Sequence, residues 1–528
     1  MVTIEKPASI KKWLADGSEI AFLDVRESGQ FGEGHPFLAI PAPYSRLELD
    51  IPALVPRKST RIVLIDGADG VAQRAANALS HLGYVKISLV EGGVDGWRRA
   101  GFKLFKGVNL PSKTFGEVVE QTLNTPHISA TDLVARIEKG EELVILDGRP
   151  LGEFHKMSIP GAICCPNGEL ALRYRDLVKN PDTPIIINCA GRTRSIVGAQ
   201  TLIDLGVPNP VYALQNGTQG WYLQDLPLDR GSSSTYPEKG GRPAADIVAR
   251  ANILAREHDV GHVDGATLRR WIGDEMRSTY VLDVRSPAET AADPIAGARP
   301  APGGQLIQAT DQYVGTRGAR LVIVDTDGVR APVVAIWLRR LGHESYLVAR
   351  IDVPEGEPHA STIRHLQDIS PDTFLARRDD FRLFDLRSSA SYRQSHVEGA
   401  VWSIRPLLSS ASSDPVVFVA DDPAVVAIAA QDIGAEAFRL TGGPEDWRQA
   451  GLRVVATPDS PDDKERIDYL FFVHDRHSGN KAAAREYLAW ETGLIAQLDE
   501  DELKLFRLPL ARRLPANEGQ PELTGHQP

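Results

Sequence analysis

Four times along the chain, an apolar run typical of a buried β-strand ends in the pattern Asp-x-Arg. The aspartates of this pattern are Asp24, Asp147, Asp283 and Asp385. A second apolar run follows in each case, and these runs end at Asp66, Cys189, Asp325 and Ala420. The spacing between the two ends is 42 residues in the first three cases and 35 in the fourth. The chain therefore contains an internal repeat whose fourth copy is shortened.

Each second strand leads into a segment with apolar residues at helical spacing, closed by a glycine suited to a helix C-terminus. Three copies then show a short strand, a Gly-containing turn and a tryptophan, at Trp97, Trp221 and Trp447. We expect each tryptophan to pack the start of a helix against its sheet. Strands that alternate with helices at this spacing predict α/β modules with mainly parallel sheets covered on both faces, in three α/β/α layers.

These signals divide the chain into four tandem modules, with a linker between the second and third and an extension after the fourth. The predicted ranges are 1–108, 125–230, 258–357 and 361–457 for modules 1 to 4, 231–257 for the linker and 458–528 for the C-terminal helical extension. The Ser-, Gly- and Pro-rich stretch at 231–243 predicts that the modules form two pairs. The second half of the extension has amphipathic helical spacing, to which we assign packing but no chemistry.

Composition limits the classes of partner. The chain of 528 residues carries a formal net charge of −11, which repels polyanions and gives no electrostatic footprint for nucleic acid. No run of about 18 apolar residues and no leader-like N-terminus occurs, so we expect a cytoplasmic protein without membrane contact. Three cysteines without C-x-x-C spacing and scattered histidines predict free thiols, with no metal site and no cofactor.

Cys189 is the candidate nucleophile. It stands where the apolar strand IIIN gives way to the loop Cys189-Ala190-Gly191-Arg192-Thr193-Arg194 and to a helix that begins near Ser195. A thiol at a helix N-terminus near arginines has a lowered pKa and favours the thiolate. The alternative is a buried strand-end thiol that acts as a small apolar group. Cys164 and Cys165 are adjacent on a strand and point to opposite faces, which favours core packing over a role as resolving thiols.

Over residues 1 to about 457 the sequence resembles the rhodanese family. The resemblance is carried by the Asp-x-Arg strands, the cysteine loop and the Gly-Gly-x-x-x-Trp segment, although Met157 and Ser158 replace the usual Gly-His before Ile159. It implies that Cys189 takes the outer sulfur of thiosulfate or a similar donor as a persulfide and passes it to a thiophilic acceptor, such as cyanide, a thiol or a protein.

The resemblance also implies roles for the loop and its surroundings. Ala190, Gly191, Arg192, Thr193, Arg194 and Ser195 would bind the donor. The two arginines would hold a divalent oxyanion, which puts thiosulfate first, although both could also be solvated loop cations. Asp147 and Arg149 would support the site as a structural ion pair.

Asp66, Asp325 and Ala420 cannot accept a sulfane sulfur, so modules 1, 3 and 4 are predicted to be inactive. We expect module 1 to pack on module 2 and wall the active site, and modules 3 and 4 to form an inactive pair. Two alternatives remain open. One is a non-catalytic scaffold or persulfide relay. The other is a phosphatase of the same fold, whose Cys-x5-Arg loop would need arginine at Ser195.

Overall fold

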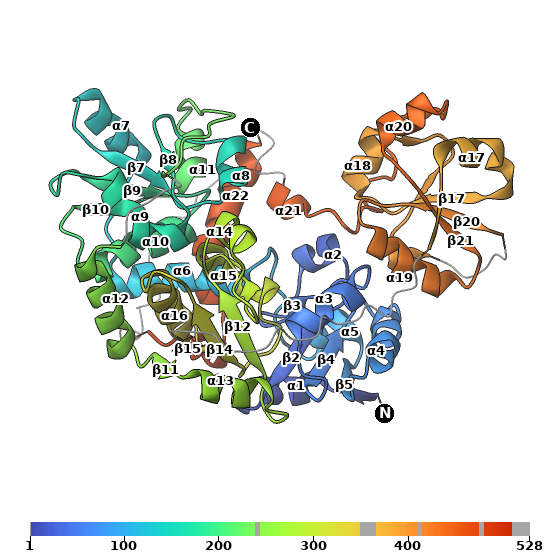
Figure 1. Ribbon diagram of the computed structural model, residues 1–528, viewed down its shortest axis with the longest axis horizontal. Coiled ribbons are helices and arrows are strands. Elements are labelled where there is room, and N and C mark those ends of the chain that lie inside the picture. The colour runs from blue at the N-terminus through green and yellow to red at the C-terminus, as the bar shows by residue number, and fades with distance from the viewer. Residues whose placement is uncertain (1, 238–242, 349–365, 409–413, 475–479, 509–528) are drawn as a thin grey trace, which may run out of the picture.

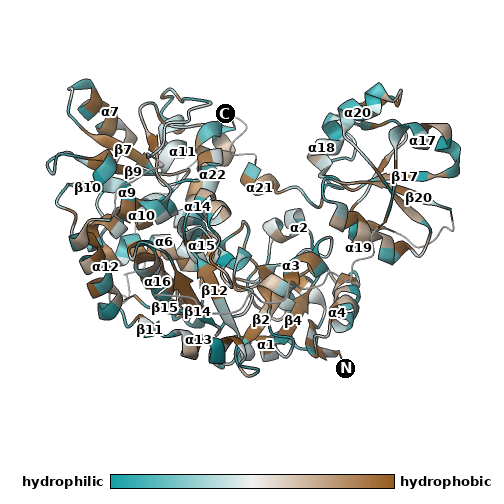
Figure 2. Ribbon diagram, in the orientation of Figure 1, coloured by the Kyte–Doolittle hydropathy of each residue, from teal (hydrophilic) through white to brown (hydrophobic). Residues whose placement is uncertain are grey.

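The computed structural model describes residues 2–237, 243–348, 366–408, 414–474 and 480–508. They form four five-stranded sheets, and every pairing within these sheets is parallel. Taking each sheet's own strands in chain order, all four share the order 1-5-4-2-3. Figure 2 shows mostly hydrophobic residues on the strands of each module and a mixture of hydrophobic and hydrophilic residues on the helices around them. The predicted α/β fold class is confirmed.

Module 1 has apolar cores on both faces of its sheet. Its elements are β1 (Thr3–Glu5), α1 (Pro7–Ala15), β2 (Ile20–Asp24), α2 (Ser28–Glu33), β3 (Ile40–Pro41), α3 (Leu47–Leu54), β4 (Arg61–Ile65), α4 (Val71–His81), β5 (Lys86–Val90) and α5 (Gly93–Arg99). Successive residues of β4 point to opposite faces, so Ile62 and Leu64 enter one core and Val63 and Ile65 the other. The strand is therefore apolar from Ile62 to Ile65, as expected of a covered parallel sheet.

Module 2 repeats this arrangement after the connecting helix α6 (Leu110–Leu123). Its elements are β6 (His127–Ile128), α7 (Ala130–Glu138), β7 (Val144–Asp147), α8 (Leu151–Lys156), β8 (Ile163–Cys164), α9 (Asn167–Leu177), β9 (Ile185–Asn188), α10 (Thr193–Asp204), β10 (Val211–Leu214) and α11 (Gly217–Leu223). Cys164 and Cys165 are both buried and belong to different cores, which confirms that they point to opposite faces. Burial raises the pKa of Cys164 to about 12, so this thiol stays protonated.

Module 3 follows helix α12 (Ala245–Glu257). Its elements are β11 (Gly261–Val263), α13 (Gly265–Ile272), β12 (Thr279–Asp283), α14 (Pro287–Ala292), β13 (Arg299–Pro300), α15 (Gly303–Gln308), the 3-10 turn η1 (Thr310–Gln312), β14 (Arg320–Val324), α16 (Arg330–Arg340) and β15 (Glu344–Val348). Part of the predicted linker, 238–242, and residues 349–365 after β15 lie outside the described residues.

Module 4 keeps the sheet but shortens the connection before its fourth strand. Its elements are β16 (Gln367–Ile369), α17 (Pro371–Ala376), η2 (Arg378–Asp380), β17 (Arg382–Asp385), α18 (Ser389–Gln394), β18 (His396–Val397), β19 (Val401–Trp402), η3 (Arg405–Leu407), β20 (Val416–Val419), α19 (Pro423–Ile433), β21 (Ala437–Leu440), α20 (Pro444–Gln449) and β22 (Val454–Val455). The modules 1 to 3 have a helix (α3, α9 and α15) where module 4 has the short turn η3. Strands β18 and β22 form a separate antiparallel pair.

The C-terminal extension returns along the molecule to module 2 (Figure 1). It contains α21 (Phe471–His474), α22 (Lys481–Thr492), η5 (Ile495–Gln497) and α23 (Glu500–Leu503). The amphipathic helix predicted in this region corresponds to α22, which packs against α6 and α11. Among the described residues, no helix combines the length and the apolar character that crossing a membrane requires.

The four Asp-x-Arg patterns form the same buried ion pair in every module. In module 2, Arg149 donates to both carboxylate oxygens of Asp147, at 2.8 and 2.7 Å, and to the carbonyl of Met157. The other three arginines make equivalent bonds to their aspartates and to a carbonyl eight residues further on. The pair therefore anchors the loop that follows the strand, whether or not the module has a nucleophile.

The modules associate differently from the predicted pairs (Figure 1). Module 2 packs on module 3 through α9, α15 and α16, while module 4 lies beside module 1. Arg405 of module 4 forms an ion pair with Glu48 of module 1, and Arg330 of module 3 forms one with Glu169 of module 2. The prediction of pairs 1–2 and 3–4 is wrong, because interfaces depend on side chains across modules that chain order does not reveal.

Candidate active site

The loop with Cys189 connects β9 to α10 at the carboxyl end of the sheet. The thiol is nearly buried, with 2% of the residue exposed, and its Sγ lies 3.3 Å from Ser195 Oγ. The Ser195 hydroxyl also donates to the carbonyl of Arg192 at 2.9 Å. The loop therefore closes on itself, with the sulfur near the first turn of α10.

The Gly-containing segment before Trp221 forms backbone hydrogen bonds with this loop. The backbone N–H of Thr218 donates to the carbonyl of Cys189 at 2.8 Å, and that of Gln219 donates to the carbonyl of Ala190 at 3.0 Å. Gly217 has φ +51°, and a Cβ there would lie 2.4 Å from the Cys189 oxygen, so a side chain is excluded. Trp221 is 4% exposed within the core, which confirms its predicted packing role.

Asn188 connects the loop to the ion pair of the neighbouring strand. Its Nδ2 donates to Asp147 Oδ2 at 2.6 Å and to Thr218 Oγ1 at 3.0 Å. Because Asp147 also holds Arg149, one buried network joins three adjacent elements beneath Cys189. Asp147 and Arg149 thus lie in a supporting position and not at the surface of the loop.

Both loop arginines are engaged by carboxylates. Arg192 donates to the two oxygens of Glu117 on α6, at 2.6 and 2.9 Å, and it also pairs with Glu120. Burial raises the pKa of Glu117 to about 7, although Arg192 opposes that shift. Arg194 pairs with Glu153 on α8, at 2.9 and 2.7 Å. Burial lowers the pKa of Arg194, but Glu153 outweighs burial and the net pKa is raised.

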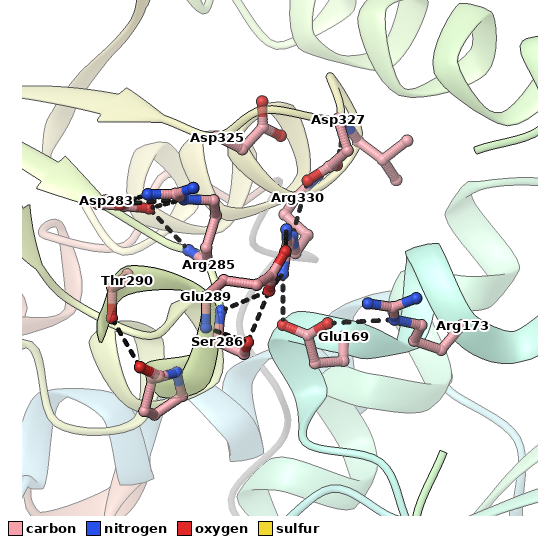
Figure 3. A network of polar contacts seen from close by, with 12 residues as sticks. Glu169, Arg173, Asp283, Arg285, Ser286, Glu289, Thr290, Asp325, Asp327 and Arg330 are labelled. Atoms are coloured by element: carbon pink, nitrogen blue, oxygen red, sulfur yellow. Dashed lines mark hydrogen bonds and ion pairs between the residues drawn. The ribbon is translucent and has the colours of Figure 1, made fainter. Parts of the chain in front are cut away.

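The Arg194–Glu153 pair recurs in module 3, which has no thiol. Arg330 stands five residues after Asp325, as Arg194 stands five after Cys189, and it donates to both oxygens of Glu289 at 2.6 and 2.8 Å. Figure 3 shows Arg330 between Glu289 of its own module, Asp327 of the loop and Glu169 of module 2. An ion pair that persists without a nucleophile indicates a role in positioning the loop.

Two modules with aspartate in place of the cysteine show what the loop binds at this position. The Asp325 carboxylate accepts from the backbone N–H groups of Gly328 at 2.9 Å and Ala331 at 2.8 Å. The Asp66 carboxylate accepts from those of Ala68 at 2.9 Å and Ala72 at 3.0 Å. Ala72 and Ala331 stand six residues after the aspartate, the offset of Ser195 from Cys189. The loop thus folds around an anionic side chain at this position.

The wall of the loop comes from connecting helix α6 and from α22, not from module 1 as predicted. Thr193 Oγ1 donates to Glu491 Oε1 of α22 at 3.0 Å, and Lys113 of α6 contacts the same oxygen at 3.1 Å. Gly191 lies so close to α22 that an added Cβ would be 3.0 Å from Glu491 Oε2. Neither helix belongs to a repeated module, so the repeat in the sequence does not place them.

Sequence reasoning missed four carboxylates of this site: Glu117, Glu120, Glu153 and Glu491. A signal existed for Glu153, because it follows the Asp of Asp-x-Arg by six residues, as Glu289 does in module 3. The other three come from α6 and α22, where no spacing in the sequence links them to the loop.

Comparison with known proteins agrees with this geometry. The model of the Rhodanese-like domain matches residues 6–100 and 129–224. A crystal structure of a thiosulfate sulfurtransferase from Pseudomonas aeruginosa is 37% identical, with a TM-score of 0.86, over 96% of this chain and 99% of that one.

Two curated relatives match about one module each. An HTH-type transcriptional regulator of Mycobacterium tuberculosis is 33% identical over 20% of this chain and 45% of its own length. A candidate sulfur carrier of Bacillus subtilis is 30% identical over 19% of this chain and 54% of its own. The chain thus spans about half the length of these curated relatives. The full-length match at 37% identity, together with the parallel sheets and the cysteine loop, shows that the chain belongs to the rhodanese-like family.

Proposed function

We propose that the protein is a sulfurtransferase that moves a sulfane sulfur from thiosulfate, or a similar donor, to a thiophilic acceptor through a persulfide on Cys189. The thiolate attacks the outer sulfur of thiosulfate, the S–S bond of the donor breaks, and sulfite leaves with the bonding electron pair. An acceptor such as cyanide then attacks the outer sulfur of the persulfide and departs as thiocyanate, which regenerates the thiolate. Charge and sulfur balance in both steps.

The observation that carries this proposal is the pair of carboxylates in modules 1 and 3. In Asp325 the chain Cβ–Cγ–Oδ has the same connectivity as Cβ–Sγ–Sδ in a cysteine persulfide, with a charged atom at its end. Backbone N–H groups of the loop reach the Asp325 and Asp66 oxygens at 2.8 to 3.0 Å. In module 2 the same loop surrounds Cys189, so its N–H groups are available to stabilise the persulfide anion.

The residues of the loop and its surroundings have separate roles in this proposal. The backbone from Ala190 to Ser195 binds the transferred sulfur, and the Ser195 hydroxyl, 3.3 Å from Sγ, would donate to the thiolate after turning away from the Arg192 carbonyl. Arg192 and Arg194 hold the loop through their carboxylate partners, and donor binding by either one requires that it leave that partner. Asp147 and Arg149 support the loop through Asn188. Cyanide, a small thiol or a protein thiol would serve as acceptor.

The test is thiosulfate-to-cyanide sulfur transfer, with the intact mass after thiosulfate treatment measured in parallel. We expect turnover and a gain of one sulfur in the wild type, and neither in Cys189→Ala. Cys164→Ala is the matched control, because it removes a thiol of the same module that is buried away from the loop. A mass gain without turnover would favour a persulfide relay. If neither the mass gain nor turnover is observed, thiosulfate is ruled out as the donor.

A further inference from the structure

We propose that α22 completes the sulfur-transfer site and that Glu491 makes the site discriminate among sulfur donors by their charge, disfavouring dianions relative to monoanions. The proposal rests on the function proposed above. It assigns chemistry to the C-terminal extension, which lies outside the four repeated modules.

The geometry places the Glu491 carboxylate directly at the nucleophile loop. Glu491 is 0% exposed, and its Oε1 accepts from Thr193 Oγ1 at 3.0 Å. Its Oε2 would lie 3.0 Å from a Cβ at Gly191, two residues after Cys189, so the backbone there approaches as closely as glycine permits. Tyr487, one turn earlier on α22, lies 3.8 Å from the same point. The helix therefore covers the loop with a buried carboxylate.

The ion pairs around the loop explain why the Glu491 carboxylate should weaken the binding of a dianionic donor. Around the loop, Arg192 pairs with Glu117 and Glu120, Arg194 pairs with Glu153, and Lys113 pairs with Glu491. Each of these three cations therefore faces at least one carboxylate. An incoming thiosulfate dianion thus enters a site whose side-chain cations already face carboxylates, and its main attraction comes from the backbone N–H groups. A buried negative charge at this distance then penalises the donor in proportion to the donor's own charge.

Two donors separate this effect from packing. Thiosulfate carries two negative charges, whereas methanethiosulfonate has a methyl group in place of one oxygen and carries one. Both deliver the same outer sulfur, and the leaving groups are sulfite and methanesulfinate. Because the electrostatic energy is linear in donor charge, removing the Glu491 charge should change KM for thiosulfate by the square of the change for methanethiosulfonate.

The experiment compares both donors on the full-length wild type and the Glu491→Gln variant, which keeps an oxygen acceptor for Thr193 and Lys113. We expect KM to fall about tenfold for thiosulfate and about threefold for methanethiosulfonate, with a smaller change in kcat. Glu491→Asp keeps the charge and should keep the wild-type ratio of the two KM values. Glu486→Gln, at an exposed position of the same helix, controls for net charge and should change neither.

Equal changes of KM for the two donors, or none, would overturn the proposal. If Glu491→Gln does not fold, Lys113→Gln tests the same electrostatic effect. Removing this cation should shift KM in the opposite direction, raising it more for thiosulfate than for methanethiosulfonate. Failure of the underlying function is distinguishable, because transfer would then survive in Cys189→Ala or be missing with both donors in the wild type.

Discussion

Replacing Glu153 with glutamine separates two roles for Arg194. If Arg194 positions the loop, the loss of its carboxylate partner loosens the loop and lowers kcat. If Arg194 binds the donor, the same loss releases a guanidinium and lowers KM for thiosulfate. The recurrence of the pair as Arg330–Glu289 in a module without a thiol favours the first role.

The magnitude follows from the geometry of the pair. Two bonds of 2.9 and 2.7 Å join the groups, and a unit charge pair at about 4 Å is worth ~4 kcal/mol at an effective dielectric constant of about 20. Glu153 is 43% exposed, so solvent reduces the contribution to ~1 kcal/mol. If that energy orders the loop for the transition state, Glu153→Gln should lower kcat about fivefold and leave KM within a factor of about two.

Steady-state transfer from thiosulfate to cyanide measures both constants. The matched control is Glu289→Gln, which removes the equivalent partner of Arg330 in module 3 and should leave kcat and KM unchanged. A severalfold fall of KM for thiosulfate at unchanged kcat would refute the positioning role and make Arg194 a donor-binding residue. Loss of kcat in both variants would instead point to a general effect on the fold.

Three further outcomes are expected. Cys189→Asp should fold with a thermal midpoint at least as high as that of Cys189→Ala, because the loops of modules 1 and 3 already hold a carboxylate, and it should transfer no sulfur in the cyanide assay. The folded-state pKa of Glu117, about 7 against 4.5 when unfolded, means that this group lowers stability by ~3 kcal/mol as pH rises from about 4.5 to 7, and Glu117→Gln should make the slope less steep by that amount in urea unfolding measured across that range. Arg330→Met should destabilise the junction of modules 2 and 3 by ~3–5 kcal/mol in the same unfolding assay, since it leaves the buried Glu169 with only its 3.6 Å contact to Arg173, and adding Glu169→Gln should restore part of the loss.

The repeat made the fold predictable because the same pattern of strands and helices occurs in each copy. Apolar stretches such as 62–65 and 185–187 are buried on both faces, and this produces runs that local pattern reading detects. The pairing of modules was not predictable in this way. It depends on contacts such as Arg405–Glu48. These two residues are 357 positions apart, and no sequence pattern links them.

In the candidate site, too, the local structure could be predicted from the sequence but the tertiary contacts could not. Cys189 and its loop follow one strand, so their proximity to the first turn of α10 could be inferred from sequence. The partners of Arg192 and Thr193 lie on α6 and α22, and such tertiary contacts decide whether an arginine is available to a substrate. The sequence suggested two cations for an oxyanion, whereas the structure gives each a carboxylate.

The aspartate at the nucleophile position has a physical rationale in the same loop. A helix N-terminus buried at a module junction leaves N–H groups that need acceptors. In module 3 the acceptors are Asp325 and Asp327, and the loop so filled presents Arg330 to Glu169 of module 2. Aspartate at the nucleophile position therefore does more than abolish the thiol. It satisfies the N–H groups of the loop internally, and the start of α16 then contacts Glu169 of module 2 through Arg330.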